Sequence, residues 1–168
     1  MKIHQAVTAA VVCLMGAAGA VPARSQASAD KAAIQALYEQ FNAGFNKKDV
    51  NAIMSVYAPD VFVFDVIPPR QYVGWDAYRK DWVDLFAGMP GPATNSIVNL
   101  DITVAGTVAY THWIEDGTMT DKDGKSTASV VRTTDVLRKR NGKWLIVQEH
   151  NSFPVDLATG RADMMSKP

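Results

Sequence analysis

Polar side chains that could carry out acid–base chemistry lie on two strands predicted at 127–140 and 144–153. The Asn141-Gly142 dipeptide between them is typical of a two-residue hairpin turn. Counting back from this turn, Asp135 lies opposite Gln148, and the alternation of side chains along a strand puts His150 on the same face. A carboxylate beside an imidazole favours general acid or base catalysis, because it can tune the imidazole pKa within the range near neutral pH.

A second turn at Asp123-Gly124 predicts that His112 also lies opposite Asp135. Two imidazoles around one carboxylate could do chemistry. They could equally form a polar cluster that only fixes the sheet, since buried polar groups are hydrogen-bonded in either case. A facial-triad metal site is a further alternative, but the chain has no compact metal-binding motif, and we predict no metal.

The other face of the same strands carries Arg132 between Glu115 and Glu149. This arrangement is typical of a structural ion-pair ladder, with a ligand-binding arginine as the alternative. Both faces depend on the strand register, because a slip of one residue moves every side chain to the opposite face. The glycines are dispersed and form no phosphate-binding loop, so we expect no cofactor.

In the half of the chain that precedes these strands, the residue pattern predicts helices. Apolar residues recur at helical spacing from a start near Ser28 to Asp30, and Asp49 can cap a second helix that stops at Ala58-Pro59. Helices followed by a meander indicate the α+β class, with three N-terminal helices packed on a curved antiparallel sheet. The remaining elements are a helix at 75–87, short strands at 61–66 and 72–73, and long strands at 97–105, 108–120, 127–140 and 144–153.

Large aromatic side chains from the helical half fit a hydrophobic core. Phe41, Tyr57 and Trp82 belong to this group, and some of them must line any cavity left between the helices and the sheet. Together with His112 and Gln148 they form the predicted ligand-binding set.

The N-terminus reads as a secretory signal peptide at residues 1–27, because Lys2 precedes an apolar stretch that ends in small residues. Cleavage is expected after Ala27 or Ala29 and would remove Cys13, the only cysteine. We therefore expect a periplasmic or secreted protein. The alternative is an uncleaved membrane-anchoring segment.

The whole chain has 17 basic and 17 acidic residues, which excludes the strong basic excess of a nucleic-acid binder. The whole chain is 48% hydrophobic, and no linker divides it. We therefore predict a single domain at residues 28–153. The tail at 154–168 has little periodicity and predicts a flexible end or one that drapes over a partner.

The order of elements resembles the nuclear transport factor 2-like superfamily, which includes ketosteroid isomerase and the SnoaL-like cyclases. The resemblance rests on "YAPDVFVFD" at 57–65, "GWDAYRKDW" at 74–82 and "TDVLRKRNGKWLIVQEHNS" at 134–152. It implies a conical α+β barrel that encloses one apolar pocket, often in a dimer formed through the outer face of the sheet.

When the resemblance is applied residue by residue, it implies that Asp65 occupies the position of the aspartate that transfers the proton in ketosteroid isomerase. It also implies that Asp135 is the acid that donates a hydrogen bond to the oxyanion. The sequence departs from the isomerase at Phe41, where an oxyanion-binding tyrosine is expected and no hydrogen bond can be donated. His150 or Tyr57 could replace that donor.

Three hypotheses about function follow. The first is a cofactor-independent isomerase, cyclase or dehydratase, in which Asp65, Asp135 and His150 act on a small apolar or carbonyl-containing compound. The second is a non-catalytic carrier or sensor that uses the same pocket. The third is a dimerising accessory module. The expected partners are a small ligand and a second copy of the chain, with no nucleic acid and, after cleavage, no membrane.

Overall fold

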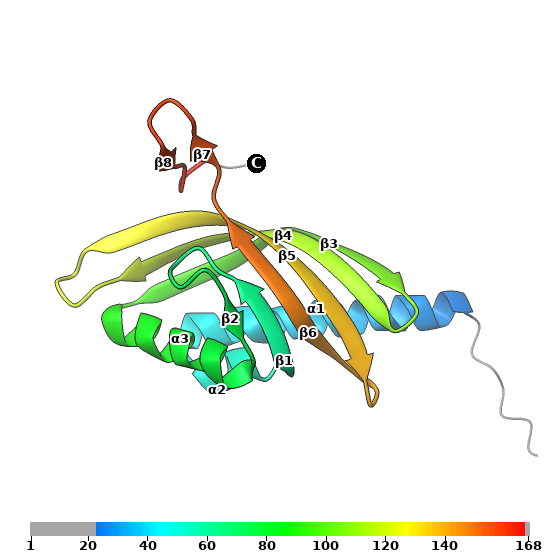
Figure 1. Ribbon diagram of the computed structural model, residues 1–168. Helices are drawn as coiled ribbons and strands as arrows, with labels where there is room; N and C mark the ends of the chain where they lie inside the picture. The colour runs from blue at the N-terminus through cyan, green and yellow to red at the C-terminus, as the bar shows by residue number, and fades with distance from the viewer. Residues whose placement is uncertain (1–22, 167–168) are drawn as a thin grey trace, which may run out of the picture.

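The computed structural model describes residues 23–166 and has the predicted α+β class. Three helices lie on the concave side of a curled sheet (Figure 1). The helices are α1 (Ala23–Lys47), α2 (Val50–Met54) and α3 (Trp75–Gly88). The strands are β1 (Tyr57–Phe64), β2 (Tyr72–Val73), β3 (Ala93–Ala105), β4 (Val108–Thr120), β5 (Ser126–Arg140) and β6 (Lys143–Ser152), followed by the short β7 (Val155–Asp156) and β8 (Arg161–Ala162).

The main sheet is open, in the order β2-β1-β6-β5-β4-β3. It therefore curls without closing into the barrel that the resemblance implied, and β2 and β3 are its edges. The sheet is also mixed, because β1 pairs with β6 in parallel while every other pairing in it is antiparallel. The expectation of a purely antiparallel sheet was wrong at this one pairing.

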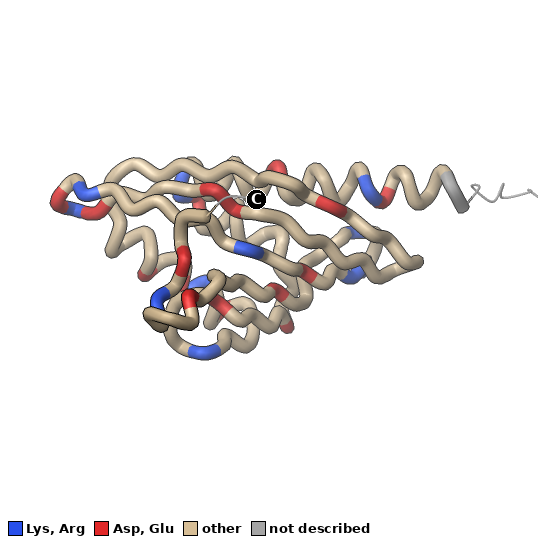
Figure 2. Tube along the Cα trace, turned by 90° about the horizontal axis from the view of Figure 1, so that it is seen from above, with Lys and Arg blue, Asp and Glu red and all other residues tan. Residues whose placement is uncertain are grey.

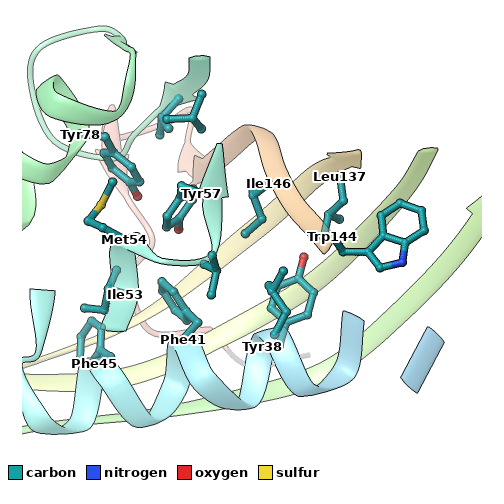
Figure 3. Close-up of a cluster of buried hydrophobic side chains, with 14 of the residues drawn as sticks. Tyr38, Phe41, Phe45, Ile53, Met54, Tyr57, Tyr78, Leu137, Trp144 and Ile146 are labelled. Carbon is teal, nitrogen blue, oxygen red and sulfur yellow. The ribbon is translucent and has the colours of Figure 1, made fainter. Parts of the chain in front are cut away.

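The core fills the space between the helices and the concave side of the sheet. Tyr38, Phe41 and Phe45 lie along one side of α1 and face side chains from α2 and β1 (Figure 3). The predicted cap of α2 is confirmed, since the Asp49 carboxylate accepts hydrogen bonds of 3.0 Å from two backbone N–H groups in the first turn. None of the helices within residues 23–166 is long and apolar enough to cross a membrane.

The β5–β6 hairpin starts in the predicted register and then departs from it. Leu137 pairs with Ile146 as expected, but a bulge follows and Val136 pairs with Gln148. Asp135 consequently lies opposite Glu149, and the predicted Asp135–Gln148 pair is wrong. Because the bulge inserts one residue into β6, Gln148 and His150 lie on the outer, convex face of the sheet.

The β4–β5 hairpin is shifted by one residue, because its turn runs from Asp121 to Lys125 and is longer than the two residues predicted. His112 therefore pairs with Thr134, and it is exposed on the outer face. The predicted placement of His112 opposite Asp135 was wrong for this reason.

The same shift overturns the predicted ion-pair ladder. Glu115 and Glu149 face the concave side of the sheet, whereas Arg132 is exposed on the other side. The three side chains are separated by the sheet itself, so neither the ladder nor a ligand-binding arginine between the two glutamates is present.

At both ends of the described chain the structure differs from what the sequence predicted. α1 begins at Ala23, before the predicted start at Ser28 to Asp30. The predicted signal peptide lies outside the described residues up to position 22, and the predicted cleavage sites fall within α1. Beyond β6 the chain forms the small β7–β8 hairpin and returns to the sheet, where the Val130 N–H donates to the Met164 carbonyl at 2.8 Å.

Candidate functional site

A cavity of about 210 Å³ lies between α1, α3 and the concave side of the sheet. Most of its wall is aromatic or aliphatic, and its polar groups include four carboxyls together with Thr127, Ser129 and Asn151. Among the described residues that line it there is no Lys, Arg or His. The aromatic lining residues are Phe41, Phe45, Tyr78, Trp82, Trp113 and Phe153, and the acidic ones are Asp65, Asp81, Glu115 and Glu149.

Asp65 reaches the cavity from the end of β1, one residue beyond the last residue of the strand. Its carboxylate accepts a hydrogen bond of 2.6 Å from the backbone N–H of Val66. Burial, followed by the charge of Glu149, raises the pKa of Asp65 to about 7. The predicted base therefore faces the cavity and changes protonation near neutral pH.

Glu149 lies on β6 and is held by three hydrogen-bond donors. The Tyr57 hydroxyl donates to Oε2 at 2.6 Å, and Oε1 accepts from the Tyr78 hydroxyl at 2.6 Å and from the Asn151 amide at 2.9 Å. Burial and the charge of Asp135 raise the pKa of Glu149 to about 7, against the three donors, which lower it. The negative charge of Glu149 is the largest charge effect on both Asp65 and Glu115.

Glu115 projects from β4 into the same cavity. Within residues 23–166 no side chain or backbone N–H donates a hydrogen bond to it. Burial, then the charges of Glu149 and Asp65, raise the pKa of Glu115 to about 8. At neutral pH its carboxyl is therefore mostly protonated, and it can donate a hydrogen bond to whatever occupies the cavity.

Asp135, a predicted catalytic residue, is fully buried and does not line the cavity. Its Oδ2 accepts hydrogen bonds from the Tyr38 hydroxyl at 2.6 Å and from Trp113 Nε1 at 2.9 Å, with Thr111 at 3.4 Å. Burial raises its pKa to about 6, and these donors oppose the rise. Because the Trp113 ring lines the cavity and its N–H bonds Asp135, the carboxyl lies behind the wall of the site.

The other predicted residues divide between the two faces of the sheet. Phe41 and Trp82 line the cavity, and Tyr57 is buried behind Glu149. His150 lies outside, where its ring packs against Phe64 at 5.6 Å between centroids. His112 and Gln148 are on the same outer face.

The structure brings Glu115, Glu149, Asn151 and Tyr78 into the site. Sequence reasoning placed the first three on the opposite face of the sheet, and it counted Tyr78 among the aromatic residues of which some must line a cavity. Glu149 and Asn151 alternate on β6, so the correct register would have placed them on the face of Asp135. The residue pattern around Val147 gives no signal for the bulge that shifts Glu149 and Asn151.

Within residues 23–166 no group of three or more His, Cys, Asp or Glu side chains is arranged to hold a metal ion. Basic and acidic residues are interspersed along the trace and do not gather at one end (Figure 2). The site is therefore an aromatic cavity with several carboxyls that titrate near neutral pH.

Solved structures share this fold. An NTF2-like protein of unknown function from Pseudomonas putida KT2440 is 29% identical, over 84% of this chain and 98% of that one, with a TM-score of 0.76. A ketosteroid isomerase-like protein from Erwinia carotovora atroseptica is 23% identical, over 72% and 93% of the two chains, with a TM-score of 0.63. A protein provisionally assigned as a scytalone dehydratase from Novosphingobium aromaticivorans is 15% identical, over 76% and 86%, with a TM-score of 0.69.

No curated protein matches the sequence. The family model described as the SnoaL-like domain matches residues 34–156, which extend from near the middle of α1 to β7 and include every residue of the cavity wall except Met164. The chain belongs to the SnoaL-like family of the NTF2-like superfamily.

Proposed function

We propose that the cavity is a cofactor-independent active site that transfers a proton on a small apolar carbonyl compound. The reaction class is isomerisation, cyclisation or dehydration. One observation carries the proposal: Asp65 and Glu115 face the same aromatic cavity, and the pKa of each carboxyl is raised, to about 7 and about 8. The names of two structural neighbours, an isomerase-like protein and a dehydratase, are consistent with this class.

The chemistry begins at Asp65. Its carboxylate form, populated in about half of the molecules at neutral pH, takes a proton from the carbon next to the carbonyl. The electron pair of that C–H bond moves toward the carbonyl oxygen, which becomes an enolate oxyanion. Asp65 then returns the proton to a different carbon of an isomerase substrate.

The oxyanion needs a hydrogen-bond donor, and Phe41 cannot supply one. Glu115 fits this role because its protonated carboxyl has no partner in the described part of the chain and projects into the cavity. Donors aimed at a developing oxyanion in a water-poor site lower a barrier strongly. Glu149 acts as a positioning residue, since the negative charge that Tyr57 and Tyr78 stabilise keeps Glu115 protonated.

The experiment uses proton exchange, because it needs no knowledge of the natural substrate. A panel of small uncharged ketones is incubated with the protein in D₂O, and proton NMR follows the loss of the C–H signals next to the carbonyl. We expect at least one ketone to exchange faster with the wild type, and Asp65→Asn to slow this exchange about 100-fold or more.

Asp60→Asn is the matched control. Asp60 is an exposed aspartate on β1, the strand that ends one residue before Asp65, and it forms an ion pair with Arg140 outside the cavity. It should leave the exchange rate unchanged. Equal rates in the wild type and Asp65→Asn would contradict the proposal.

A non-catalytic ligand-binding protein is the second candidate, and Phe41 favours it, because the loss of an oxyanion donor harms an enzyme more than a binder. It predicts ketones that raise the melting temperature without any exchange above the buffer rate. A dimerising accessory module, the third, predicts neither effect.

We also propose that the protein is exported and forms a homodimer through the outer face of the sheet. Large side chains exposed on that face support the dimer, among them Tyr110 at 51% and Phe64 at 38%. Light scattering should give twice the chain mass, and Tyr110→Asp should give the monomer. A monomeric wild type contradicts the dimer, and an intact N-terminus in protein purified from the periplasm contradicts cleavage.

A further inference from the structure

The aromatic cavity reaches the surface beside α3. Ile67 lines the cavity and is 37% exposed, so this side chain has one side on the cavity and another in solvent. Leu85 and Met89 also line the cavity, and both are partly exposed. These three side chains therefore mark a place where the cavity meets solvent.

A groove on the surface begins at the same place. It lies between the β1–β2 side of the molecule, with Pro68, Pro69 and Tyr72, and the stretch of α3 from Ala77 to Gly88. We call it the α3 groove. The cavity and the α3 groove share four lining residues, which are Ile67, Asp81, Leu85 and Met89.

The spacing of the shared residues shows how the two spaces adjoin. Asp81 and Leu85 are one turn apart on α3, and Met89 follows one turn later at the end of the helix, so the three form a ridge. On one side of this ridge Trp82 faces the cavity, and on the other Asp84 faces the groove. A molecule in the cavity can therefore reach the groove by passing between the ridge and Ile67.

The charged side chains of the α3 groove already have partners. The Tyr72 hydroxyl donates to the Asp81 carboxylate at 2.6 Å, and Lys80 forms an exposed ion pair with Asp84. The rest of the groove wall is apolar, so an apolar chain gains by leaving water there and competes with no hydrogen bond. Between Ala77 and Gly88 the helix rises by about 16 Å, which is longer than a chain of five carbons.

The cavity itself is too small for a ring and a chain together. An apolar cavity of about 150 Å³ accommodates a benzene ring in another protein, and the 210 Å³ found here is enough for one substituted ring. Asp65 and Val66 line the cavity directly before Ile67 in the chain. The carbon that gives its proton to Asp65 therefore lies close to Ile67, and a chain attached to that carbon can leave the cavity there.

We infer that the site takes a carbonyl compound in two parts: a ring-sized group that fills the aromatic cavity, and an apolar chain, attached next to the carbonyl, that passes Ile67 and lies in the α3 groove. This inference rests on the proposed function and names the substrate class of that site. The groove then selects among carbonyl compounds by the length of the chain, without contact with the reacting atoms.

The experiment compares acetophenone with hexanophenone, which share the ring and the carbonyl and differ in the length of the chain by four methylene groups. Isothermal titration calorimetry measures both affinities. Gly88→Trp blocks the groove, because Gly88 lines the groove and not the cavity, and a Cβ placed there meets no atom within 4 Å. Ala87→Trp is the matched control, since Ala87 is the preceding residue of α3, is exposed and lines neither space.

A methylene group that leaves water completely is worth about a fourfold gain in affinity, and an open groove covers about half of a chain. We therefore expect the wild type to bind hexanophenone about 10- to 20-fold more tightly than acetophenone. Gly88→Trp should reduce this ratio to below about 3-fold, because the indole fills the groove, and should leave the affinity for acetophenone unchanged. Ala87→Trp should keep the wild-type ratio.

Equal affinities of the wild type for the two ketones would overturn the inference. So would the same ratio in Gly88→Trp as in the wild type, or a wild type that binds neither ketone. Proton exchange next to the carbonyl, followed with the same two ketones, separates this result from the proposed catalysis. A gain from the chain that Gly88→Trp abolishes, without Asp65-dependent exchange, upholds the role of the groove and removes the catalysis. Asp65-dependent exchange without any gain from the chain does the reverse.

Discussion

The concave face of the sheet buries carboxyls in two regions that differ in what surrounds them. Asp135 is enclosed by the Tyr38 hydroxyl, the Trp113 indole and Thr111, all of which can donate to it. Glu115, four residues along β4 from the partner of Asp135, faces the cavity and has no donor in the described chain. Burial alone therefore does not mark a functional group. The carboxyl that faces the cavity and receives no hydrogen bond from the described chain is the one that is available to a ligand.

Glu149 connects the two regions. It lines the cavity, yet three donors hold it as firmly as Asp135 is held. The charge of Asp135 raises the pKa of Glu149, and the charge of Glu149 in turn raises the pKa values of Asp65 and Glu115. Electrostatic coupling thus extends from the structural region into the candidate active site.

The largest expected effect lies in the structural region. Asp135→Ala leaves the Tyr38 hydroxyl and the Trp113 N–H buried without an acceptor, and should lower the free energy of unfolding by about 3 kcal/mol. Asp65→Ala removes a carboxyl that faces the cavity and should cost less than about 1 kcal/mol. Urea unfolding of both variants measures the difference. Equal losses would erase the distinction between the regions.

An intermediate effect comes from Glu115 and depends on pH. Since burial raises its pKa to about 8, the folded protein keeps a proton that the unfolded chain releases from about pH 4 upward. The stability that the protonated Glu115 contributes is complete below about pH 4 and is lost as the pH rises through about 8. The free energy of unfolding should therefore fall between about pH 4 and about pH 8.

Glu115→Gln keeps the shape of the side chain but cannot ionise. It should flatten the pH dependence and stabilise the protein by on the order of 2 kcal/mol at about pH 9, after allowance for contact with solvent in the cavity. Thermal unfolding at about pH 5 and about pH 9 measures this. Parallel curves for the variant and the wild type would show that Glu115 titrates as an exposed glutamate does.

The smallest effect is expected at the outer face. His150→Ala removes an exposed side chain whose ring packs against Phe64, so stability should change by less than about 0.5 kcal/mol. Ketone affinity, measured in the same samples, should not change. A loss of ketone affinity would show that His150 belongs to the site, as the sequence analysis predicted.

The class of fold, the extent of β4 and the Asp49 cap of α2 could be predicted from the sequence, because helical spacing, a capping residue and long alternating strands are local signals. The end of α2 was predicted wrongly: the helix stops at Met54, before the expected stop at Ala58-Pro59, and β1 already begins at Tyr57. The prediction of the site depended on the strand register, which is set by less local features of the sequence than a helix or a strand is. The Asn141-Gly142 turn was identified correctly, yet a bulge a few residues away reversed the faces of His150 and Glu149. Asp65 was found through the family resemblance, since nothing in its spacing alone singles it out.

We propose that Asp65 is a cavity carboxyl that changes protonation near neutral pH. Carbon-13 NMR of the side-chain carboxyls across a pH titration tests it directly, with Asp65→Asn to assign the signal. A midpoint near 7 is expected for Asp65, while the exposed Asp60, whose hydrogen bonds from Arg140 lower its pKa, should titrate below the usual range of an aspartate. A midpoint for Asp65 near 4, the ordinary value for a solvated aspartate, would contradict this role of Asp65.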